Sequence, residues 1–378
     1  MSEAFFSRLG AELIDLKNQG NFRQLPKFTG DKMSSINLSS NDYLGIARDT
    51  ALRSAFLERI NPELALLSAS SSRLLCGNYP IYKELEDLLS DYYNSEAALV
   101  FNSGYHTNIG ILPALANSNI LLLVDKLVHA SLIDGLKLTK ARCIRYRHLD
   151  YEQLEYLVSA YSNDFETVII VTESIFSMDG DMADLARLVA IKKSQSNLLL
   201  YVDEAHAVGV FGANGLGLAE EKGCVLEIDF LVGTFGKALG SIGGYLICKE
   251  VVRAFLINKM RPLLYTTGLP PINLLWSKFV LEKMISLNNR RKYLAALSDA
   301  LRTGLGKKCY ACSSNSHIVP LIIGDSETVI NKVSELEKKG FLLSAIRSPT
   351  VAKGTERIRI SLNSNLSYSD IDNLLRLL

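Results

Sequence analysis

The sequence predicts an α/β protein in which a mostly parallel, seven-stranded, doubly wound sheet is followed by a smaller α+β domain. Between residues 97 and 250, short runs rich in Val, Ile and Leu alternate with helical segments, the pattern of buried strands with covering helices. After residue 270 the pattern changes to a long helical stretch and then to shorter strands. With 378 residues, 48% of them hydrophobic, the chain is long enough to bury a large core and a smaller one.

Seven apolar runs are the candidate strands of the sheet. They are AALVF (97–101), NILLLVD (119–125), CIRYR (143–147), TVIIVTE (167–173), LLLYVDE (198–204), DFLVGTF (229–235) and GYLICK (244–249). Right-handed crossovers place helices on both faces of such a sheet and gather the carboxyl ends of its strands at one edge, where ligands bind. Polar residues follow three of these runs: Ser103 with Gly104, Asp203, and Thr234 with Lys237. The sequence therefore predicts one site in which these residues converge.

The residues after Pro270 and Pro271 indicate a separate α+β domain. A helical stretch runs to about residue 304, and the runs HIVPLII, VINKVSELEKKG, FLLSAIR and RIRISL follow it as strand, helix, strand and strand. Ser367, with Asp370 in the first turn, opens a last helix. We expect three parts: an amphipathic N-terminal helix and arm (1–45), a large α/β domain (46–268) and the C-terminal domain (269–378).

Charge and hydropathy favour a cytoplasmic protein that acts on small molecules. The 41 basic and 40 acidic side chains give a formal charge of +1 without blocks of like charge, which argues against nucleic-acid and membrane partners. Charged side chains interrupt the start of the chain, unlike a secretory signal. The longest apolar runs are far shorter than the ~20 residues that cross a bilayer.

The six cysteines are expected to be free thiols, because nothing indicates a secreted disulfide framework. Only Cys309 and Cys312 form a CxxC pair, and the nearest further ligand is His317. A zinc site needs a second pair of ligands at matching spacing. We therefore predict no metal site.

The strongest chemical signal is a lysine in a glycine-dense loop, GTFGKALGSIGG (233–244), directly after a predicted strand. It is not a Walker loop, because two residues rather than four precede the Gly-Lys pair and alanine follows the lysine. Glycines around a lysine leave room for a planar ligand, and a lysine in a dry pocket has a lowered pKa and attacks carbonyl groups. Lys237 is thus predicted to hold pyridoxal 5′-phosphate as a Schiff base.

A second signal lies in VDEAHAVGVFGANGLG (202–217). An acid at the end of a strand can pair with a protonated pyridine nitrogen, a role that suits Asp203. His206, three residues later, could reach the phenolic oxygen of the same ring. An isolated Asp-x-x-His is equally well explained as a helix cap or a pair of metal ligands. Asp203 precedes Lys237 by 34 residues, across one helical crossover, and this spacing favours the cofactor role.

Nine spaced motifs cover most of the chain. They are SSNDYLG (39–45), SSRLLCGNYPIYKELE (71–86), FNSGYHTN (101–108), DKLVHASLIDG (125–135), VTESIFSMDGD (171–181), VDEAHAVG (202–209), TFGKALG (234–240), YTTGLPP (265–271) and PTVAKGTERIRISL (349–362). In these motifs the chain resembles the α-oxoamine synthases, which are fold-type I pyridoxal-phosphate-dependent transferases. It is most similar to those that make 8-amino-7-oxononanoate in biotin biosynthesis.

The resemblance implies how the ring of the cofactor is held. Lys237 binds the cofactor and moves protons, and Asp203 pairs with the ring nitrogen. His206, helped by Ser177, holds the phenolic oxygen, and His129 stacks on the ring face. These five residues are the expected core of the site.

The phosphate contacts implied by the resemblance come from a helix N-terminus and a hydroxyl. The backbone N–H groups of Gly104 and Tyr105 and the side chain of Thr234 supply donors without a nearby carboxylate. The family is homodimeric with shared active sites, so Thr266 or Thr267 is expected to reach a phosphate across the dimer interface.

Substrate contacts are implied for four further residues. Arg359 matches the clamp for the amino-acid carboxylate, because a guanidinium binds a carboxylate with two hydrogen bonds. Arg357 lies on the same strand face, which leaves open which arginine binds. Arg23, Asn41 and Thr350 match positions on the substrate side.

The implied reaction condenses L-alanine with a pimeloyl thioester, carried on coenzyme A or an acyl carrier protein. Glycine C-acetyltransferase, 5-aminolevulinate synthase and serine palmitoyltransferase share this chemistry with other substrates, and they remain alternatives. So do a plain aminotransferase and a non-catalytic protein of the same fold. Four residues depart from those common in the family and affect any statement about substrate preference: Ser72, Tyr82, Glu204 and Ala352.

Overall fold

The computed structural model describes residues 2–25 and 35–378, which form two compact units. The large unit comprises residues 41–177 and 181–293. The small unit contains the other described residues: 2–25, 35–40, 178–180 and 294–378. This division differs from the expected domains, because residues 269–293 stay with the large unit and the N-terminal helix belongs to the small one.

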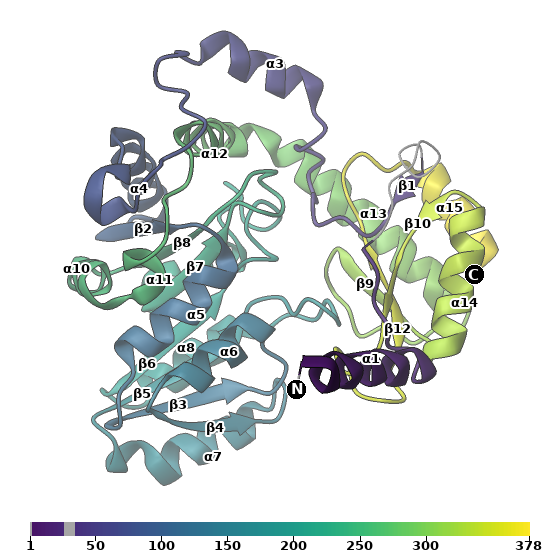
Figure 1. Ribbon diagram of the computed structural model, residues 1–378, viewed down its shortest axis with the longest axis horizontal. Helices are drawn as coiled ribbons and strands as arrows, with labels where there is room; N and C mark the ends of the chain where they lie inside the picture. Colours follow the sequence, from purple (N-terminus) through teal and green to yellow (C-terminus); the bar gives the residue numbers. More distant parts are fainter. Residues whose placement is uncertain (1, 26–34) are drawn as a thin grey trace. The chain divides into compact units, whose positions relative to one another are not determined.

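The large unit is built on a seven-stranded mixed sheet with the order β2-β8-β7-β6-β5-β3-β4 (Figure 1). Its strands are β2 (Ala97–Phe101), β3 (Ile120–Asp125), β4 (Arg142–Tyr146), β5 (Thr167–Glu173), β6 (Leu198–Asp203), β7 (Phe230–Thr234) and β8 (Gly244–Cys248). Strand β8 is antiparallel to both of its neighbours, and all other neighbouring strands are parallel. The predicted fold class is confirmed.

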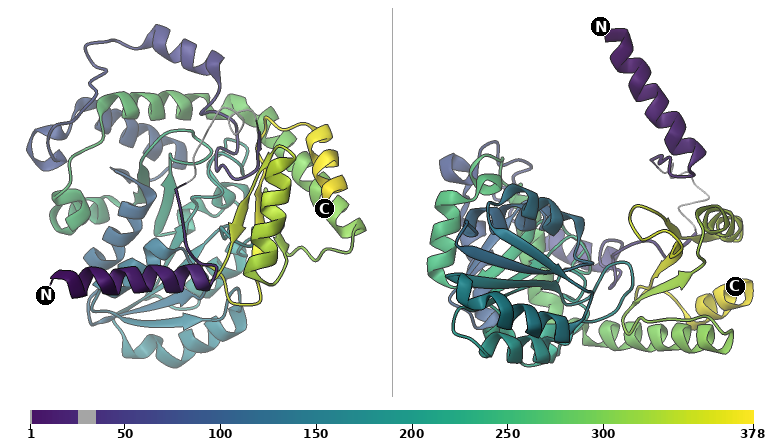
Figure 2. Two further views of the ribbon diagram at one scale, coloured as in Figure 1. Left: turned by 45° about the vertical axis from the view of Figure 1, so that its right-hand side comes forward. Right: turned by 90° about the horizontal axis from the view of Figure 1, so that it is seen from below.

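Helices cover both faces of this sheet (Figure 2). The helices of the large unit are α3 (Thr50–Arg59), α4 (Pro80–Tyr93), α5 (Gly104–Leu115), α6 (Ala130–Leu138), α7 (Tyr151–Tyr161), α8 (Leu185–Lys193), α9 (Leu218–Glu221), α10 (Glu250–Lys259), α11 (Arg261–Leu264) and α12 (Pro271–Lys283). The central strands are buried along almost their whole length, which explains why they read as continuous apolar runs in the sequence.

The connections after β2 and β3 bring two helix N-termini to the carboxyl edge of the sheet. Ser103 caps α5 by accepting a hydrogen bond from the backbone N–H of His106 at 3.1 Å. His129 caps α6, because its Nδ1 accepts from the backbone N–H of Ser131 at 3.2 Å. Strands β5, β6 and β7 end at the same edge because they run parallel to β3.

The small unit contains a three-stranded antiparallel sheet with the order β11-β12-β9 and a two-stranded parallel pair, β1 and β10. Its strands are β1 (Ile36–Asn37), β9 (Ile318–Ile322), β10 (Phe341–Leu342), β11 (Ser344–Ile346) and β12 (Arg357–Ser361), and its helices are α1 (Ser2–Asn18), α14 (Ser326–Lys338) and α15 (Tyr368–Leu377). The chain passes from one unit to the other within α13 (Asn288–Lys307). Ser367 and Asp370 form the expected capping box of α15.

Helix α1 forms where a helix was expected, but it buries no apolar face. The described side chains along it are exposed apart from the half-buried Gly10, and Phe6 and Ile14 are 67% and 57% accessible. Within residues 2–25 and 35–378, no helix is long and apolar enough to cross a membrane.

Candidate functional site

A pocket of about 190 Å³ opens at the carboxyl edge of the large unit's sheet. It gathers eight of the predicted site residues: Asn41, Gly104, Tyr105, His129, Asp203, His206, Thr234 and Lys237. Five further residues complete its lining: Asn108, Ser131, Glu173, Ala205 and Gly236. The expected convergence of residues from separate strand ends is therefore observed.

Lys237 lies in the loop after β7 and is half-buried. Its Nζ is 2.7 Å from Nε2 of His206. The other ring nitrogen of His206, Nδ1, is 2.6 Å from the hydroxyl of Tyr43. The amine that is expected to react is thus held at the end of a buried hydrogen-bonded chain.

Asp203 ends β6 and is 5% exposed. Its Oδ2 accepts a hydrogen bond of 2.7 Å from Nδ2 of Asn108, and its Oδ1 accepts one of 2.9 Å from the backbone N–H of Ala205. Asn108 is itself fixed, because Tyr201 donates to its Oδ1 at 2.6 Å. These bonds hold the carboxylate in one orientation at the floor of the pocket.

Glu173 is a second acid in the pocket and lies opposite Asp203 in the register of β5 and β6. Burial, and then the charge of Asp203, raise the pKa of Glu173 well above its usual range. Its Oε1 accepts a hydrogen bond from the backbone N–H of His129. Burial thus disfavours the charged form of the Glu173 carboxyl.

His129 is held as a neutral ring. Burial lowers its pKa, although the charge of Asp203 opposes this effect. Its Nδ1 accepts from the backbone N–H of Ser131, which leaves the single proton on Nε2. A neutral imidazole on the wall of the pocket suits the expected stacking against a planar ring.

The N-terminus of α5 provides the expected anion site. The backbone N–H groups of Gly104 and Tyr105 lie in its first turn and have no intrahelical acceptor. Gly244 permits the close approach of β8, since a Cβ there would lie 2.8 Å from the backbone nitrogen of Gly104. Thr234 donates its hydroxyl proton to the backbone oxygen of Gly243 at 2.8 Å, so it must redirect this proton to donate to a phosphate.

A charged cluster fixes the loop that leads into His129. His148 lies between two carboxylates, with Nδ1 2.9 Å from Oδ1 of Asp125 and Nε2 2.7 Å from Oδ2 of Asp181. The carboxylate of Asp125 also accepts from the backbone N–H of Leu127 at 2.8 Å. Burial alone would lower the pKa of His148, but the hydrogen bonds that its ring donates to Asp125 and Asp181 raise it to about 10.

We expect His148→Leu to lower the free energy of unfolding by about 3 kcal/mol at pH 7, because two largely buried carboxylates lose their cation. The pKa of His148 rises from 6.5 to about 10 on folding, so its stabilisation is complete below pH 6.5 and is lost as the pH rises through 10. Urea denaturation of both proteins from pH 6 to 10 measures this. A difference between them that stays constant over this range would contradict the assignment.

Some predicted residues lie outside the pocket. Ser177, on the loop after β5, does not line it. Thr266 and Thr267 are exposed or half-buried near Asn102, whose Nδ2 donates to the backbone oxygen of Thr267 at 2.6 Å. Tyr82, one of the departures from the family pattern, is fully buried, and its hydroxyl accepts from the backbone N–H of Leu269 at 2.7 Å.

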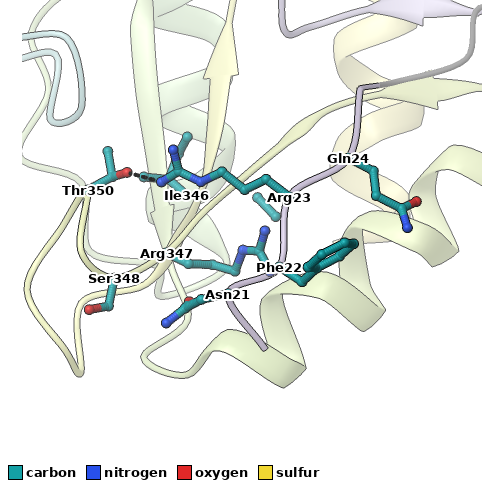
Figure 3. Close-up of a pocket in the computed structure, with 9 residues that line it drawn as sticks. Asn21, Phe22, Arg23, Gln24, Ile346, Arg347, Ser348 and Thr350 are labelled. Atoms are coloured by element: carbon teal, nitrogen blue, oxygen red, sulfur yellow. Dashed lines mark hydrogen bonds between the residues drawn. The ribbon is translucent and has the colours of Figure 1, made fainter. Parts of the chain in front are cut away.

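In the small unit, Arg23 and Thr350 line a separate pocket of about 360 Å³ (Figure 3). Nη2 of Arg23 donates to the hydroxyl of Thr350 at 3.1 Å. The other lining residues are Asn21, Phe22, Gln24, Ala345, Ile346, Arg347 and Ser348. Among the described residues that line this pocket, Arg23 and Arg347 carry guanidinium groups and none carries a carboxylate.

The two arginines of β12 differ in their partners. Arg357 pairs with the carboxylate of Asp179, and its Nε donates to the backbone oxygen of Thr355 at 2.9 Å. Nη1 of Arg359 donates to the hydroxyl of Ser361 at 2.6 Å. Arg357 is therefore already paired with a carboxylate of the small unit.

Among the residues at the site that were not predicted, Tyr43, Asn108 and Glu173 hydrogen-bond to predicted ones. Asn108 and Tyr43 belong to the motifs FNSGYHTN and SSNDYLG, and Glu173 is the last residue of a predicted strand. The position of Glu173 next to Asp203 at the strand ends was the available signal. Only the folded chain reveals the partners of the other two: His206 lies 163 positions after Tyr43, and Asp203 lies 95 positions after Asn108.

Comparison with known proteins places the chain in a family. The model of aminotransferase class I and II matches residues 34–378. The chain belongs to this family. Among the residues that the structure describes, no cluster of three or more His, Cys, Asp or Glu side chains is arranged to hold a metal ion.

Within the family, the most similar curated proteins support the resemblance seen in the motifs. A protein of Pasteurella multocida named "Putative 8-amino-7-oxononanoate synthase" is 49% identical over 372 residues, which cover 96% of each chain. A protein of Haemophilus influenzae with the same name is 47% identical over 376 residues, 98% of each chain. The resemblance to the α-oxoamine synthases is thereby confirmed.

Two solved structures show the same fold. A serine palmitoyltransferase from S. paucimobilis with a bound adduct of pyridoxal phosphate and myriocin aligns with a TM-score of 0.88 and 27% identity, covering 99% of this chain and 96% of that one. An 8-amino-7-oxononanoate synthase from Francisella tularensis aligns with a TM-score of 0.77 and 27% identity, covering 91% and 97%. The predicted fold-type I architecture is confirmed.

Enzymes of this family use pyridoxal 5′-phosphate, which confirms the predicted cofactor. The pocket fits this group by its chemistry. It offers a lysine amine, one oriented carboxylate, a neutral imidazole on the wall and free N–H groups at a helix N-terminus. Each of these matches one part of the cofactor: the aldehyde, the ring nitrogen, the ring face and the phosphate.

Proposed function

We propose that the protein catalyses the decarboxylative condensation of L-alanine with a pimeloyl thioester, which yields 8-amino-7-oxononanoate, carbon dioxide and the free thiol. The observation that carries this proposal is the buried set of Lys237, His206 and Asp203 in a chain whose curated relatives bear that enzyme's name at 46–50% identity. When bound, pyridoxal phosphate supplies an electron sink for the electron pair released at the Cα of the amino acid.

The chain's own residues do the remaining work. The amine of Lys237 binds the cofactor, then takes the proton from the Cα of alanine and later returns one. Asp203 keeps the ring nitrogen protonated, which its fixed orientation by Asn108 supports. His206 holds the phenolic oxygen of the ring, with Ser177 as a second donor. Gly104, Tyr105 and Thr234 hold the phosphate.

The substrate carboxylates are assigned to the small unit. Arg359 binds the carboxylate of alanine, and Arg23 and Thr350 bind the acyl substrate, with Asn41 on the substrate side of the large unit's pocket. The pocket around Arg23 and Arg347 is chemically suited to an acyl chain that ends in a carboxylate, because its lining combines two cations with the apolar side chains of Phe22 and Ile346. An acetyl group has no charge to place there.

A homodimer with shared sites is part of the proposal, with Thr266 or Thr267 reaching the phosphate in the partner subunit. Two other functions compete with it. The serine palmitoyltransferases among the solved structures have the higher TM-score, so another α-oxoamine synthase activity is the main rival. A plain aminotransferase would use alanine but leave the thioester intact.

The test is a substrate panel with the purified holoenzyme. Alanine, glycine and serine are each combined with pimeloyl, acetyl, succinyl and palmitoyl thioesters, and the release of carbon dioxide, thiol and pyruvate is measured. We expect equal amounts of carbon dioxide and thiol, with the highest kcat/KM for alanine and the pimeloyl thioester. Faster turnover of another pair, or pyruvate without carbon dioxide, would refute the proposal. Pimeloyl-coenzyme A and the carrier-protein thioester compared side by side identify the carrier.

A further inference from the structure

Tyr43 lies outside the pocket lining but contacts two residues that belong to it, Asn41 and His206. Its side chain is fully buried, and its hydroxyl lies 2.6 Å from Nδ1 of His206. The same hydroxyl lies 3.1 Å from Oδ1 of Asn41. On the far side of the imidazole, Nε2 is 2.7 Å from Nζ of Lys237. Four side chains thus form one continuous hydrogen-bonded chain within the large unit.

The protons of this chain can be counted. A phenol has one proton to donate, and a neutral imidazole has one N–H and one acceptor nitrogen. If Tyr43 donates to Asn41, its oxygen accepts from Nδ1–H of His206, and Nε2 is an acceptor. If Tyr43 donates to Nδ1 instead, the imidazole proton sits on Nε2, which becomes a donor. The direction of the Tyr43 hydroxyl therefore determines which ring nitrogen of His206 carries the proton and donates it.

We propose that Tyr43 is a positioning residue that sets the tautomer of His206 to match the state of Lys237. While Lys237 is a free ammonium group it donates to Nε2, which requires the proton of His206 to be on Nδ1. Once the amine of Lys237 is engaged with the cofactor, Nε2–H is free to donate to the phenolic oxygen, and Tyr43 then donates to Nδ1. Between the two arrangements, Nε2 gains the proton that the ammonium group of Lys237 loses when its amine is engaged, and Nδ1 loses its proton to solvent. The hydroxyl of Tyr43 then rotates from Asn41 towards Nδ1, and no heavy atom has to move.

Other titratable groups line the same pocket, and each has its own partner. Asp203 accepts from Asn108, Glu173 accepts from the backbone N–H of His129, and Nδ1 of His129 accepts from the backbone N–H of Ser131. Tyr43 is the buried hydroxyl that lies within hydrogen-bond distance of Nδ1 of His206. This contact makes Tyr43 the residue to change.

The inference rests on the proposed attachment of the cofactor to Lys237. The holoenzyme with Tyr43→Phe keeps the buried ring and loses only the hydroxyl. An N–H donor at Nε2 of His206 stabilises negative charge on the phenolic oxygen of the cofactor. Without this donor, the phenolic oxygen binds the proton that it shares with the nitrogen of Lys237 more tightly. We expect the pH midpoint of the cofactor's visible absorbance to rise by about 0.5–1 unit. Nitrogen-15 NMR of His206 should show the proton moved from Nε2.

The matched control is Tyr93→Phe, which removes another buried tyrosine hydroxyl that donates to the backbone oxygen of Leu216 at 2.7 Å. It should leave the midpoint and the His206 signals unchanged. A second variant works in the opposite direction: 3-fluorotyrosine at position 43 is a stronger donor to Nδ1, so the midpoint should fall. This variant also covers the case in which Tyr43→Phe fails to fold.

The possible failures can be told apart. If the wild-type enzyme shows no cofactor absorbance that Lys237→Ala removes, the proposed attachment is wrong. If that absorbance is present but the midpoint and the His206 tautomer are the same in the wild type, Tyr43→Phe and the fluorinated variant, then only the role of Tyr43 is refuted.

Discussion

We expect Lys237→Ala to lower kcat by on the order of 10⁴-fold or more, the largest effect of any single substitution in this chain. The amine is proposed both to hold the cofactor covalently and to move the proton at the Cα of the substrate. Among residues 2–25 and 35–378, no other side chain that lines the pocket carries a primary amine to take over both roles. Alanine removes the amine without adding bulk.

Borohydride reduction followed by peptide mass analysis measures the covalent attachment directly. The wild-type enzyme should yield one cofactor-modified peptide that contains position 237, and the variant should yield none. Lys249→Ala is the control, because this exposed lysine precedes α10 and lies outside the pocket lining. An unchanged reducible adduct in Lys237→Ala would show that another lysine binds the cofactor.

Most strands of the large unit were predictable because they are buried along almost their whole length; only the edge strand β4 is largely exposed. Each of the seven expected runs contains the observed strand to within about one residue, for example Thr167–Glu173 and Ala97–Phe101. The direction of β8 was not predicted, since an antiparallel strand between buried neighbours has the same apolar pattern as a parallel one. The apolar residues of α1 did predict a helix, but not whether its apolar side chains would be covered.

The site was predictable to the extent that it follows from strand ends. Asp203, Thr234 and Lys237 lie at or after the carboxyl ends of parallel strands, and the fold brings such positions together. The contacts that orient these groups were not predictable. Asn108 and Tyr43 act through single hydrogen bonds to residues far away in the chain, and no local pattern distinguishes such a side chain from an ordinary core polar residue.

The roles of Arg23, Thr350 and Arg359 came from the resemblance alone. A sequence pattern cannot separate Arg359 from Arg357, because both point to the same face of β12. The ion pair between Arg357 and Asp179, a partner distant in the chain, is visible only in the folded chain. The binding role of Arg359 stays a prediction from the resemblance.

Asp203→Asn is expected to have the second-largest effect, a fall in kcat of about 10²–10⁴-fold. Asparagine nearly preserves the shape of the side chain, but it is neutral and cannot keep the ring nitrogen protonated. It also presents an amide to Nδ2 of Asn108 or to the backbone N–H of Ala205, both of which donate to the carboxylate. One of these donors therefore loses its acceptor, and the cofactor should bind more weakly as well.

Glu173→Gln is the comparison that isolates charge from hydrogen bonding. Glu173 lines the same pocket, but burial, and then the charge of Asp203, raise the pKa of its carboxyl well above its usual range. Glutamine keeps an oxygen that accepts from the backbone N–H of His129, so we expect kcat to fall by less than about tenfold. Steady-state kinetics and cofactor titration of both variants measure this. Equal losses would mean that the charge of Asp203 is not what the ring nitrogen requires.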